Sequence, residues 1–392
     1  MNIQPAERIS DFKPYFFAQL NNRLSVLQKK GVDIIRLDMG SPDLPPEEFI
    51  IDKLVESARR NDSHGYSQMG GTPEFREAVS GYYFRRFNVG LDARTQVLAL
   101  IGSKEGLFNL SQVLLNPGDS VLVPDPGYPV YRSSSLIAGA VIHPMPLLEE
   151  NYYLPRFEDI LVETAKNAKI LWLNYPNNPT GASASLNFFH EAVKFAREYE
   201  ILLAHDAPYM EIGYDGVRAP SILQVPGSEE VCVEFNSLSK TYNMAGWRLG
   251  IAAGNPDVIQ LLHTYKSQVD SSQFLPILEA GISALNGDQT WLEERNLIYQ
   301  KRRDIVYEGL KTTGLDALLP TAGLYVWFRI PEKWDKSIEF CDALLDATGV
   351  SITPGSVYGN FGEGFGRISL VTETSRMAEA MKRIASWLKG LP

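Results

Sequence analysis

The sequence of 392 residues is poor in the residues that hold disulfide scaffolds or metal centres together. It contains two cysteines, Cys232 and Cys341, and five histidines. Two cysteines cannot build a disulfide framework, and alone they are too few for a structural metal site. Both stand in apolar stretches, so we expect buried, inert thiols and no bound metal.

The chain also lacks a long apolar run and an excess of basic residues. No stretch approaches the roughly 18 consecutive apolar residues of a membrane span, and the N-terminal residues contain no apolar signal core. The net charge is −10, without a basic cluster. Because nucleic-acid binding needs clustered positive charge, we predict a cytoplasmic protein that binds neither nucleic acid nor membrane.

What the sequence does contain is an alternation of helical and strand patterns from residue 47 onward. Continuous apolar runs of strand length occur at 97–101, 120–123, 169–174 and 201–205. Helical patterns occupy 47–60, 73–87 and 104–115. Continuous apolar strands that alternate with helices are typical of a mostly parallel sheet buried on both faces.

The last third of the chain predicts a smaller unit. A long charged helix begins after Gly287, strand patterns follow at 323–330 and 367–371, and a final helix starts at Ser375. The length of the chain is sufficient for two cores. We therefore predict a large α/β domain at 47–286 and a small α+β domain formed by 1–46 and 287–392.

Polar residues follow directly after the predicted strands. The segments are Gly102-Ser103-Lys104, Asp125 to Tyr128, "NYPNNPTG" at 174–181, "HDAPY" at 205–209, and Ser237. Ligands of an open parallel sheet bind outside the carboxyl ends of its strands. Five strand ends that carry such residues are more than packing requires.

Lys240 lies among these segments, in "FNSLSKTYNMAGWRLG" at 235–250. A lysine in a connection usually extends to solvent. Asn-Pro-Thr-Gly alone is usually a turn, and Asp206 alone can cap a helix. The occurrence of all these residues at strand ends, in order around one lysine, favours a common site instead.

The chemistry of these residues fits pyridoxal 5′-phosphate. A helix that starts at Gly102-Ser103 attracts a phosphate, and Arg248 adds a bidentate cation. Ser237 and Ser239 add hydroxyl groups. Tyr128 presents a flat face on which a ring can stack.

The remaining residues match the cofactor's ring and its aldehyde. Asp206 can keep the pyridine nitrogen protonated, which makes the ring an electron sink. Asn178 and Tyr209 can hold the phenolic oxygen. Lys240 would form the imine and, once displaced by substrate, move the proton.

The motifs "NYPNNPTG", "HDAPY" and "SLSKTYNMAGWRLG", in this order, resemble the class I/II aminotransferases of PLP fold type I. The resemblance extends from "LDMGSPDLP" at 37–45 to "GRISL" at 366–370. It implies that Lys240, Asp206 and Tyr209 are catalytic. It also implies cofactor contacts from Ser103, Lys104, Tyr128, Asn178, Ser237, Ser239 and Arg248.

The same resemblance implies how substrate and a partner subunit take part. Arg367 would bind the α-carboxylate of the substrate, with Gly40 and Asn178 beside it. Tyr66, in "HGYSQMGG", would reach the phosphate of the neighbouring subunit. We therefore expect a homodimer with shared active sites.

Three further stretches, "IGSKEG", "PDPGYPVYR" and "LNYPNNPTGA", most resemble the LL-diaminopimelate aminotransferases. Tyr15 falls where that subfamily has a tyrosine that contacts the substrate. The plant-type enzymes carry an acidic residue just after the position of Tyr66, whereas residues 67–71 supply none here. For a distal carboxylate of the substrate, the candidate cation is Lys104.

We expect an aminotransferase that moves an amino group from LL-diaminopimelate or glutamate to a 2-oxo acid. One alternative is a β-carbon–sulfur lyase of the same fold, which would release pyruvate and ammonia without an acceptor. Another is a non-catalytic PLP-sensing module of a transcription regulator. Such a module needs a DNA-binding domain, for which about 36 residues before Leu37 are too few.

Overall fold

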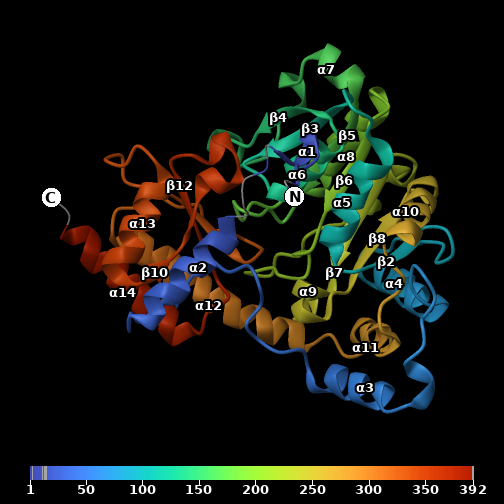
Figure 1. Cartoon of the computed structure of the whole chain (residues 1–392), viewed down its shortest axis with the longest axis horizontal. Coiled ribbons are helices and arrows are strands. Elements are labelled where there is room, and N and C mark those ends of the chain that lie inside the picture. The colour runs from blue at the N-terminus through green and yellow to red at the C-terminus, as the bar shows by residue number, and fades with distance from the viewer. Residues whose placement is uncertain (2, 11, 13–15, 391–392) are drawn as a thin grey trace.

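The computed structural model describes every residue except 2, 11, 13–15 and 391–392 (Figure 1). Its largest element is a seven-stranded sheet with the strand order β2-β8-β7-β6-β5-β3-β4. The strands are β2 (Val97–Leu100), β3 (Ser120–Asp125), β4 (Val141–Pro146), β5 (Ala168–Asn174), β6 (Leu202–Asp206), β7 (Cys232–Ser237) and β8 (Gly250–Gly254). The mostly parallel sheet predicted from the apolar runs is confirmed. Strand β4 was not predicted, because its exposed and polar residues interrupt the apolar pattern.

The direction of each strand decides which residues meet at the sheet's edge. Strands β7, β6, β5, β3 and β4 are parallel, whereas β8 is antiparallel to both of its neighbours, β7 and β2. Strand β2 therefore runs in the same direction as β7. As a result, the carboxyl ends of six strands and the amino end of β8 lie at one edge.

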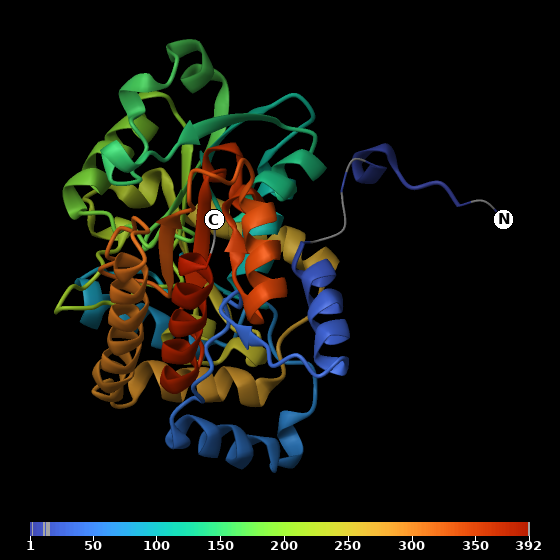
Figure 2. The same cartoon turned by 90° about the vertical axis from the view of Figure 1, so that its left-hand side faces the viewer.

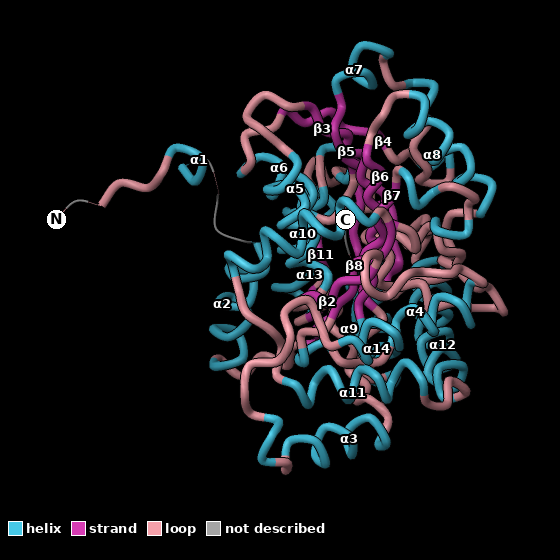
Figure 3. Tube along the Cα trace, turned by 90° about the vertical axis from the view of Figure 1, so that its right-hand side faces the viewer, coloured by secondary structure: helices cyan, strands magenta, loops and turns pink. Residues whose placement is uncertain are grey.

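Helices cover both faces of this sheet (Figure 3). One face packs against α5 (Ser103–Leu114), α6 (Pro129–Ile137) and α10 (Pro256–Val269). The other packs against α4 (Pro73–Phe87), α8 (Leu186–Glu198) and α11 (Leu275–Asn286). Consecutive residues of β5 pack on opposite faces of the sheet: Trp172 belongs to one core and Leu173 to the other. This double burial is the reason for the unbroken apolar runs in the sequence.

A second core forms around two small sheets. Strands β9 (Tyr325–Arg329), β12 (Phe365–Ser369) and β11 (Thr353–Pro354) make an antiparallel sheet, and β1 (Ile35–Arg36) pairs with β10 (Val350–Ser351). They pack with α12 (Trp291–Thr312), α13 (Ser337–Thr348) and α14 (Thr374–Lys389). Figure 2 shows α12 and α14 side by side. Strands of two residues were too short to predict, and the proposed domain boundaries stay a prediction.

The N-terminal elements differ in how they contact this second core. Leu20 and Leu24 of α2 (Phe16–Lys29) pack against Leu345 of α13. By contrast, α1 (Glu7–Ser10) buries none of its residues. Helix α3 (Glu48–Ala58) packs on α11 instead. Among the described residues, no helix is both long and apolar enough to cross a membrane.

Both cysteines are buried, as expected from their apolar surroundings. Burial raises the pKa of the Cys232 and Cys341 thiols, so neither forms a thiolate readily at neutral pH.

Candidate active site

A pocket of about 510 Å³ opens at the edge of the large sheet where the strand ends meet. The predicted residues that line it are Gly40, Ser103, Lys104, Tyr128, Asn178, Asp206, Tyr209, Ser237, Ser239, Lys240, Arg248 and Arg367. Residues that the sequence did not single out, among them Phe17, Asn21, Asn174, Tyr325 and Tyr358, line it as well. The fold thus brings together residues from both cores.

Lys240 projects from α9 (Leu238–Thr241), a single turn that follows β7 directly. The Ser237 hydroxyl caps this turn by accepting the N–H of Ser239 at 3.2 Å. The Lys240 ammonium donates to the carbonyl of Gly40. Burial, with Arg248 and Arg367 nearby, lowers the pKa of Lys240 to about 8, against the opposing effect of Asp206. A lysine with a lowered pKa is a better nucleophile and base near neutral pH.

Asp206 ends β6 and is 3% exposed. One carboxylate oxygen, Oδ2, accepts the Tyr131 hydroxyl at 2.6 Å, while the buried Oδ1 has no hydrogen-bond partner among the described residues. Burial raises the pKa of Asp206 to about 6, although Tyr131 acts in the opposite direction. A carboxylate oxygen buried in this way is costly unless a ligand supplies a donor or a cation.

Asn174 and Tyr131 organise this part of the site and were missed from the sequence. The Asn174 amide donates to the carbonyl of Asp206 at 2.7 Å, and its oxygen accepts the N–H of Asn178 at 2.8 Å. Tyr131 stacks on Trp172, with ring centroids 5.2 Å apart. Both residues resemble ordinary core and turn residues in sequence. The only available signal for Tyr131 was its place one helical turn after Tyr128.

The start of α5, together with the reversed strand β8, forms a cradle for an anion. Gly102 caps α5 with φ 73°, and a side chain there would collide with the Arg248 guanidinium. A side chain at Gly250 would collide with the backbone N of Ser103. The Ser239 hydroxyl is buried and has no hydrogen-bond partner in the part of the chain that the structure describes. Backbone N–H groups at a helix start, a hydroxyl and a guanidinium are the donors that a phosphate requires.

Arg367 of β12 reaches the same pocket from the second core and is 2% exposed. Its nitrogens donate to Asn178 Oδ1 at 2.9 Å and to the Asp38 carbonyl at 2.7 Å. The guanidinium lies 4.1 Å from the Tyr325 ring centroid, and its buried Nε has no partner among the described residues. A buried arginine that contacts neutral groups in this way is suited to bind a carboxylate.

Tyr209 and Lys104 complete the set of pocket residues. The Tyr209 hydroxyl lies 2.8 Å from that of Tyr325, which the sequence did not indicate. Lys104 Nζ lies 5.9 Å from the centroid of the Tyr128 ring. Burial and the charge of Arg248 lower the pKa of Lys104.

Two predicted residues are not among those that line the pocket. Tyr66 is 93% exposed and does not line the pocket of its own chain. Tyr15 lies outside the described residues.

The residues present fit pyridoxal 5′-phosphate. The bare Asp206 oxygen matches the protonated ring nitrogen, and the cradle at Gly102, Ser239 and Arg248 matches the phosphate. Lys240, which lines the same pocket and whose pKa both Asp206 and Arg248 affect, matches the aldehyde.

A lysine of lowered pKa and a buried arginine in one pocket at the strand ends of an open α/β sheet are suited to the chemistry of amino acids. Residues 32–384 match the model of the family "Aminotransferase class I and II". The chain belongs to this family and is therefore a transaminase.

Individual relatives match over nearly their full length. An LL-diaminopimelate aminotransferase of Moorella thermoacetica is 48% identical over 97% of this chain and 98% of its own. The substrate-bound structure of BacF from Bacillus subtilis superimposes with a TM-score of 0.95 at 37% identity, covering 99% and 98% of the two chains. A probable N-succinyldiaminopimelate aminotransferase of Thermus thermophilus gives 0.90 at 38% identity, covering 94% and 99%.

Proposed function

We propose that this transaminase carries pyridoxal 5′-phosphate on Lys240 and takes its amino group from a dicarboxylic amino acid, LL-diaminopimelate or glutamate. The observation that carries the proposal is the position of Lys240. It shares one pocket with the bare Asp206 oxygen and with Arg367, which has no carboxylate partner within ion-pair distance among the described residues.

Each part of the cofactor has residues suited to hold it. The start of α5 at Ser103, with Ser237, Ser239 and Arg248, would bind the phosphate. Asp206 would pair with the ring nitrogen, and Asn178 and Tyr209 with the phenolic oxygen. Tyr128 would stack on the ring. When bound, the cofactor supplies an electron sink for the bond that breaks at the substrate's α-carbon.

The chain's own residues would orient the substrate and move its proton. Arg367 would hold the α-carboxylate and so direct the α-carbon towards Lys240. With a pKa of about 8, the Lys240 amine is partly neutral near physiological pH and can accept a proton from that carbon and return it. Asp206 and Arg367 both lie near enough to Lys240 to affect its pKa. If Asp206 binds the ring and Arg367 the substrate, the Lys240 amine can therefore reach both.

The choice of a dicarboxylic donor rests on a second cation. Arg367 binds a group that every amino acid has, so it cannot discriminate between donors. Lys104 lines the same pocket beside Tyr128 and is our candidate for the distal carboxylate. The diaminopimelate names of several relatives support this choice. Residues 67–71 offer no acidic partner for a distal amino group, which keeps glutamate as the alternative donor.

A homodimer with shared sites is part of the same proposal. The high exposure of Tyr66 supports a role for this tyrosine at a neighbouring subunit. We also propose the division into a large domain at 47–286 and a small domain at 1–46 and 287–392. Most residues of the two core clusters support this division, whereas Tyr209, Ile212 and Tyr214 of the proposed large domain pack in the second core. The cytoplasmic location stays a prediction.

A half-reaction panel tests the substrate. Single amino acids are mixed with the purified, PLP-loaded enzyme, and the spectral change of the cofactor gives the rate for each donor. We expect LL-diaminopimelate or glutamate to exceed alanine and phenylalanine in kcat/KM. Lys104→Ala should raise KM for dicarboxylic donors, because removing one partner of a buried charge contact costs roughly 2–5 kcal/mol.

Alanine serves as the internal control, because it has no distal carboxylate and Lys104→Ala should leave its KM almost unchanged. A higher kcat/KM for alanine or phenylalanine than for both dicarboxylic donors would refute the substrate proposal. Release of pyruvate from a cysteine conjugate without an oxo acid would indicate a lyase activity instead.

A further inference from the structure

A buried arginine of α12, Arg295, contacts the backbone of the segment that carries Lys240. Its side chain is 3% exposed. Nη1 donates to the carbonyl of Lys240 at 3.2 Å and to that of Thr241. Nη2 donates to the carbonyl of Glu211 at 2.8 Å. One guanidinium thus joins two separate segments of the pocket wall.

The Arg295 guanidinium is fully hydrogen-bonded yet has no carboxylate partner within ion-pair distance among the described residues. Its remaining donors reach Asn296 Oδ1, at 3.2 Å from Nε and 2.9 Å from Nη2. Burial lowers the pKa of Arg295, although nearby Tyr299 and Glu211 oppose this effect. A buried cation is costly unless its hydrogen bonds are made. Backbone carbonyls therefore take the place of a counter-ion here.

These carbonyls belong to the end of α9. This helix has only four residues, so its last carbonyls have no partners within the helix. A cation at the carboxyl end of a helix is favourable, because the helix dipole is negative there. The geometry of the single turn that carries Lys240 therefore depends on a donor from outside, and Arg295 supplies it.

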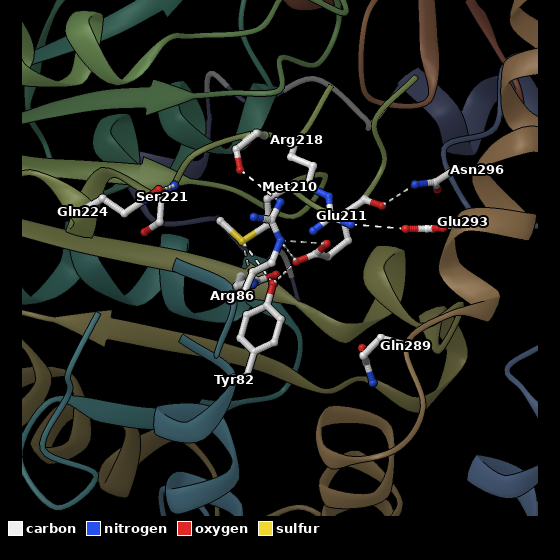
Figure 4. Close-up of polar contacts among 12 residues, drawn as sticks. Tyr82, Arg86, Met210, Glu211, Arg218, Ser221, Gln224, Gln289, Glu293 and Asn296 are labelled. Atoms are coloured by element: carbon white, nitrogen blue, oxygen red, sulfur yellow. Dashed lines mark hydrogen bonds and ion pairs between the residues drawn. The ribbon is translucent and has the colours of Figure 1, made fainter. Parts of the chain in front are cut away.

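The other segment, at Glu211, lies two residues after Tyr209. Asn296 Nδ2 donates to the Glu211 carbonyl at 2.9 Å (Figure 4). The same carbonyl accepts the hydrogen bond from Arg295. The Glu211 carboxylate accepts hydrogen bonds from Tyr82 and Arg86. Glu211 is therefore held in place by α4. Through its bond to the Glu211 carbonyl, Arg295 connects α9 to this fixed segment.

We propose that Arg295 is a positioning residue, which sets the place of the Lys240 backbone and so the approach of its amine to the cofactor's aldehyde. This inference rests on the proposed attachment of pyridoxal 5′-phosphate to Lys240. In that attachment the amine nitrogen bonds to the aldehyde carbon and one water leaves. Attack of this kind tolerates little displacement, since about 1 Å of misplacement can cost roughly 100-fold in rate.

Arg303, two turns further along α12, provides a matched control. It is also 3% exposed, and it contacts Asp215 at 2.6 Å and the carbonyl of Pro320 at 3.2 Å. It has no hydrogen bond to the segments of Lys240 or Tyr209. Arg295→Gln and Arg303→Gln remove the same buried group from the same helix.

The test compares covalent capture with non-covalent binding. Cofactor-free protein is mixed with pyridoxal 5′-phosphate in a stopped-flow instrument, and growth of the visible band reports reaction with Lys240. Titration with pyridoxamine 5′-phosphate, which has no aldehyde, reports the pocket alone. Arg295→Gln should slow capture by up to about 100-fold and leave the pyridoxamine 5′-phosphate Kd unchanged. Arg303→Gln, which also removes ion pairs with Asp215 and Asp304, should lower Tm but capture pyridoxal 5′-phosphate at the wild-type rate.

The outcomes separate the two proposals. Wild-type protein that does not capture pyridoxal 5′-phosphate refutes the proposed function, whatever the variants do. Capture by Arg295→Gln at the wild-type rate overturns the positioning role. The role is also overturned if Arg295→Gln weakens the binding of pyridoxamine 5′-phosphate by the same factor as it slows the capture of pyridoxal 5′-phosphate. If Arg295→Gln does not fold, Arg295→Lys, which keeps the charge but loses the fork, takes its place in the same comparison.

Discussion

At the scale of single residues, the site contains buried groups whose charged form is costly in a poorly solvated pocket. Asp206 has one bare oxygen, and Lys240 has its pKa lowered to about 8 by burial and by two arginines. Both features weaken the free protein and become favourable only when a ligand arrives. The roles of these residues can therefore be tested by measuring ligand affinity and the pH dependence of stability.

Asp206 should make the cofactor-free protein less stable as the pH rises. Its pKa is about 6 in the folded protein against 3.8 as the ordinary value. A raised pKa of this kind favours folding while the group is protonated, and this advantage is lost as the pH rises through about 6. Relative to Asp206→Asn, the wild type should lose up to about 3 kcal/mol between pH 4 and pH 8, since one pKa unit corresponds to about 1.4 kcal/mol.

Urea unfolding of the two cofactor-free proteins across this pH range checks the prediction. A constant difference in unfolding free energy from pH 4 to pH 8 would contradict it. With pyridoxal 5′-phosphate bound, the wild type should be more stable than Asp206→Asn at pH 8. The Asp206 carboxylate then pairs with the ring cation, at a gain of roughly 1.5–3 kcal/mol.

Lys240→Ala should abolish transamination but keep cofactor binding. The proposed phosphate contacts at Ser103, Ser239 and Arg248 do not depend on Lys240. Equilibrium dialysis should therefore still detect pyridoxal 5′-phosphate on the variant. In the wild type, borohydride reduction followed by mass spectrometry should find the pyridoxyl group on Lys240, and a label on any other lysine would refute the assignment.

At the scale of elements, the junctions between strands and helices carry the function. The turn at Gly102 joins β2 to α5, and the turn at Arg248 leads into β8. Both residues have positive φ, 73° and 57° respectively. These two turns bring the helix start and the guanidinium together.

Gly102→Ala should weaken phosphate binding more than it weakens the fold. The added methyl group would collide with the Arg248 guanidinium. The backbone at Gly102, with φ 73° and ψ 153°, also lies in a region that is almost exclusive to glycine and would cost an alanine about 1–3 kcal/mol. Gly118→Ala is the control, because Gly118 also has positive φ, 92°, but no atom lies near its added methyl group. Both variants should lose stability, and only Gly102→Ala should raise the Kd for pyridoxamine 5′-phosphate.

The sequence predicted these junctions well because strand ends are marked by sharp changes from apolar to polar residues. Ser103, Asp206 and Ser237 all stand at such changes. Tyr131 and Tyr325 could not be found in this way, since a buried tyrosine in a core and one that hydrogen-bonds a site residue look alike in sequence. Strands β10 and β11 escaped prediction because two residues show no periodicity.

At the scale of the whole molecule, the pocket collects residues that are far apart in the chain. Gly40 precedes the large sheet, Lys240 follows β7 of that sheet, and Arg367 belongs to β12 of the second core. Tyr66 is predicted to complete the site from a second copy of the chain. If this prediction holds, the active unit is a dimer of the chain.

Mixed dimers test the shared site. Lys240→Ala and Tyr66→Ala proteins should each have little activity alone. After joint unfolding and refolding, a mixed dimer would combine Lys240 of one chain with Tyr66 of the other in one intact site. Recovered activity is therefore expected, and a mixture that stays as inactive as its components would refute the sharing of Tyr66.

The position of three buried arginines on α12 limits how this chain can change in length. Arg295, Arg302 and Arg303 point to α9, to Asp43 near Gly40, and to Asp215. An insertion of one residue between Arg295 and Arg302 would turn the latter two by about 100° around the helix axis. Arg302 and Arg303 would then no longer donate hydrogen bonds to Asp43 and Asp215. Surface loops generally tolerate the insertion or deletion of single residues. Within α12, by contrast, the number of residues between Arg295 and Arg303 must stay the same for all three contacts to form.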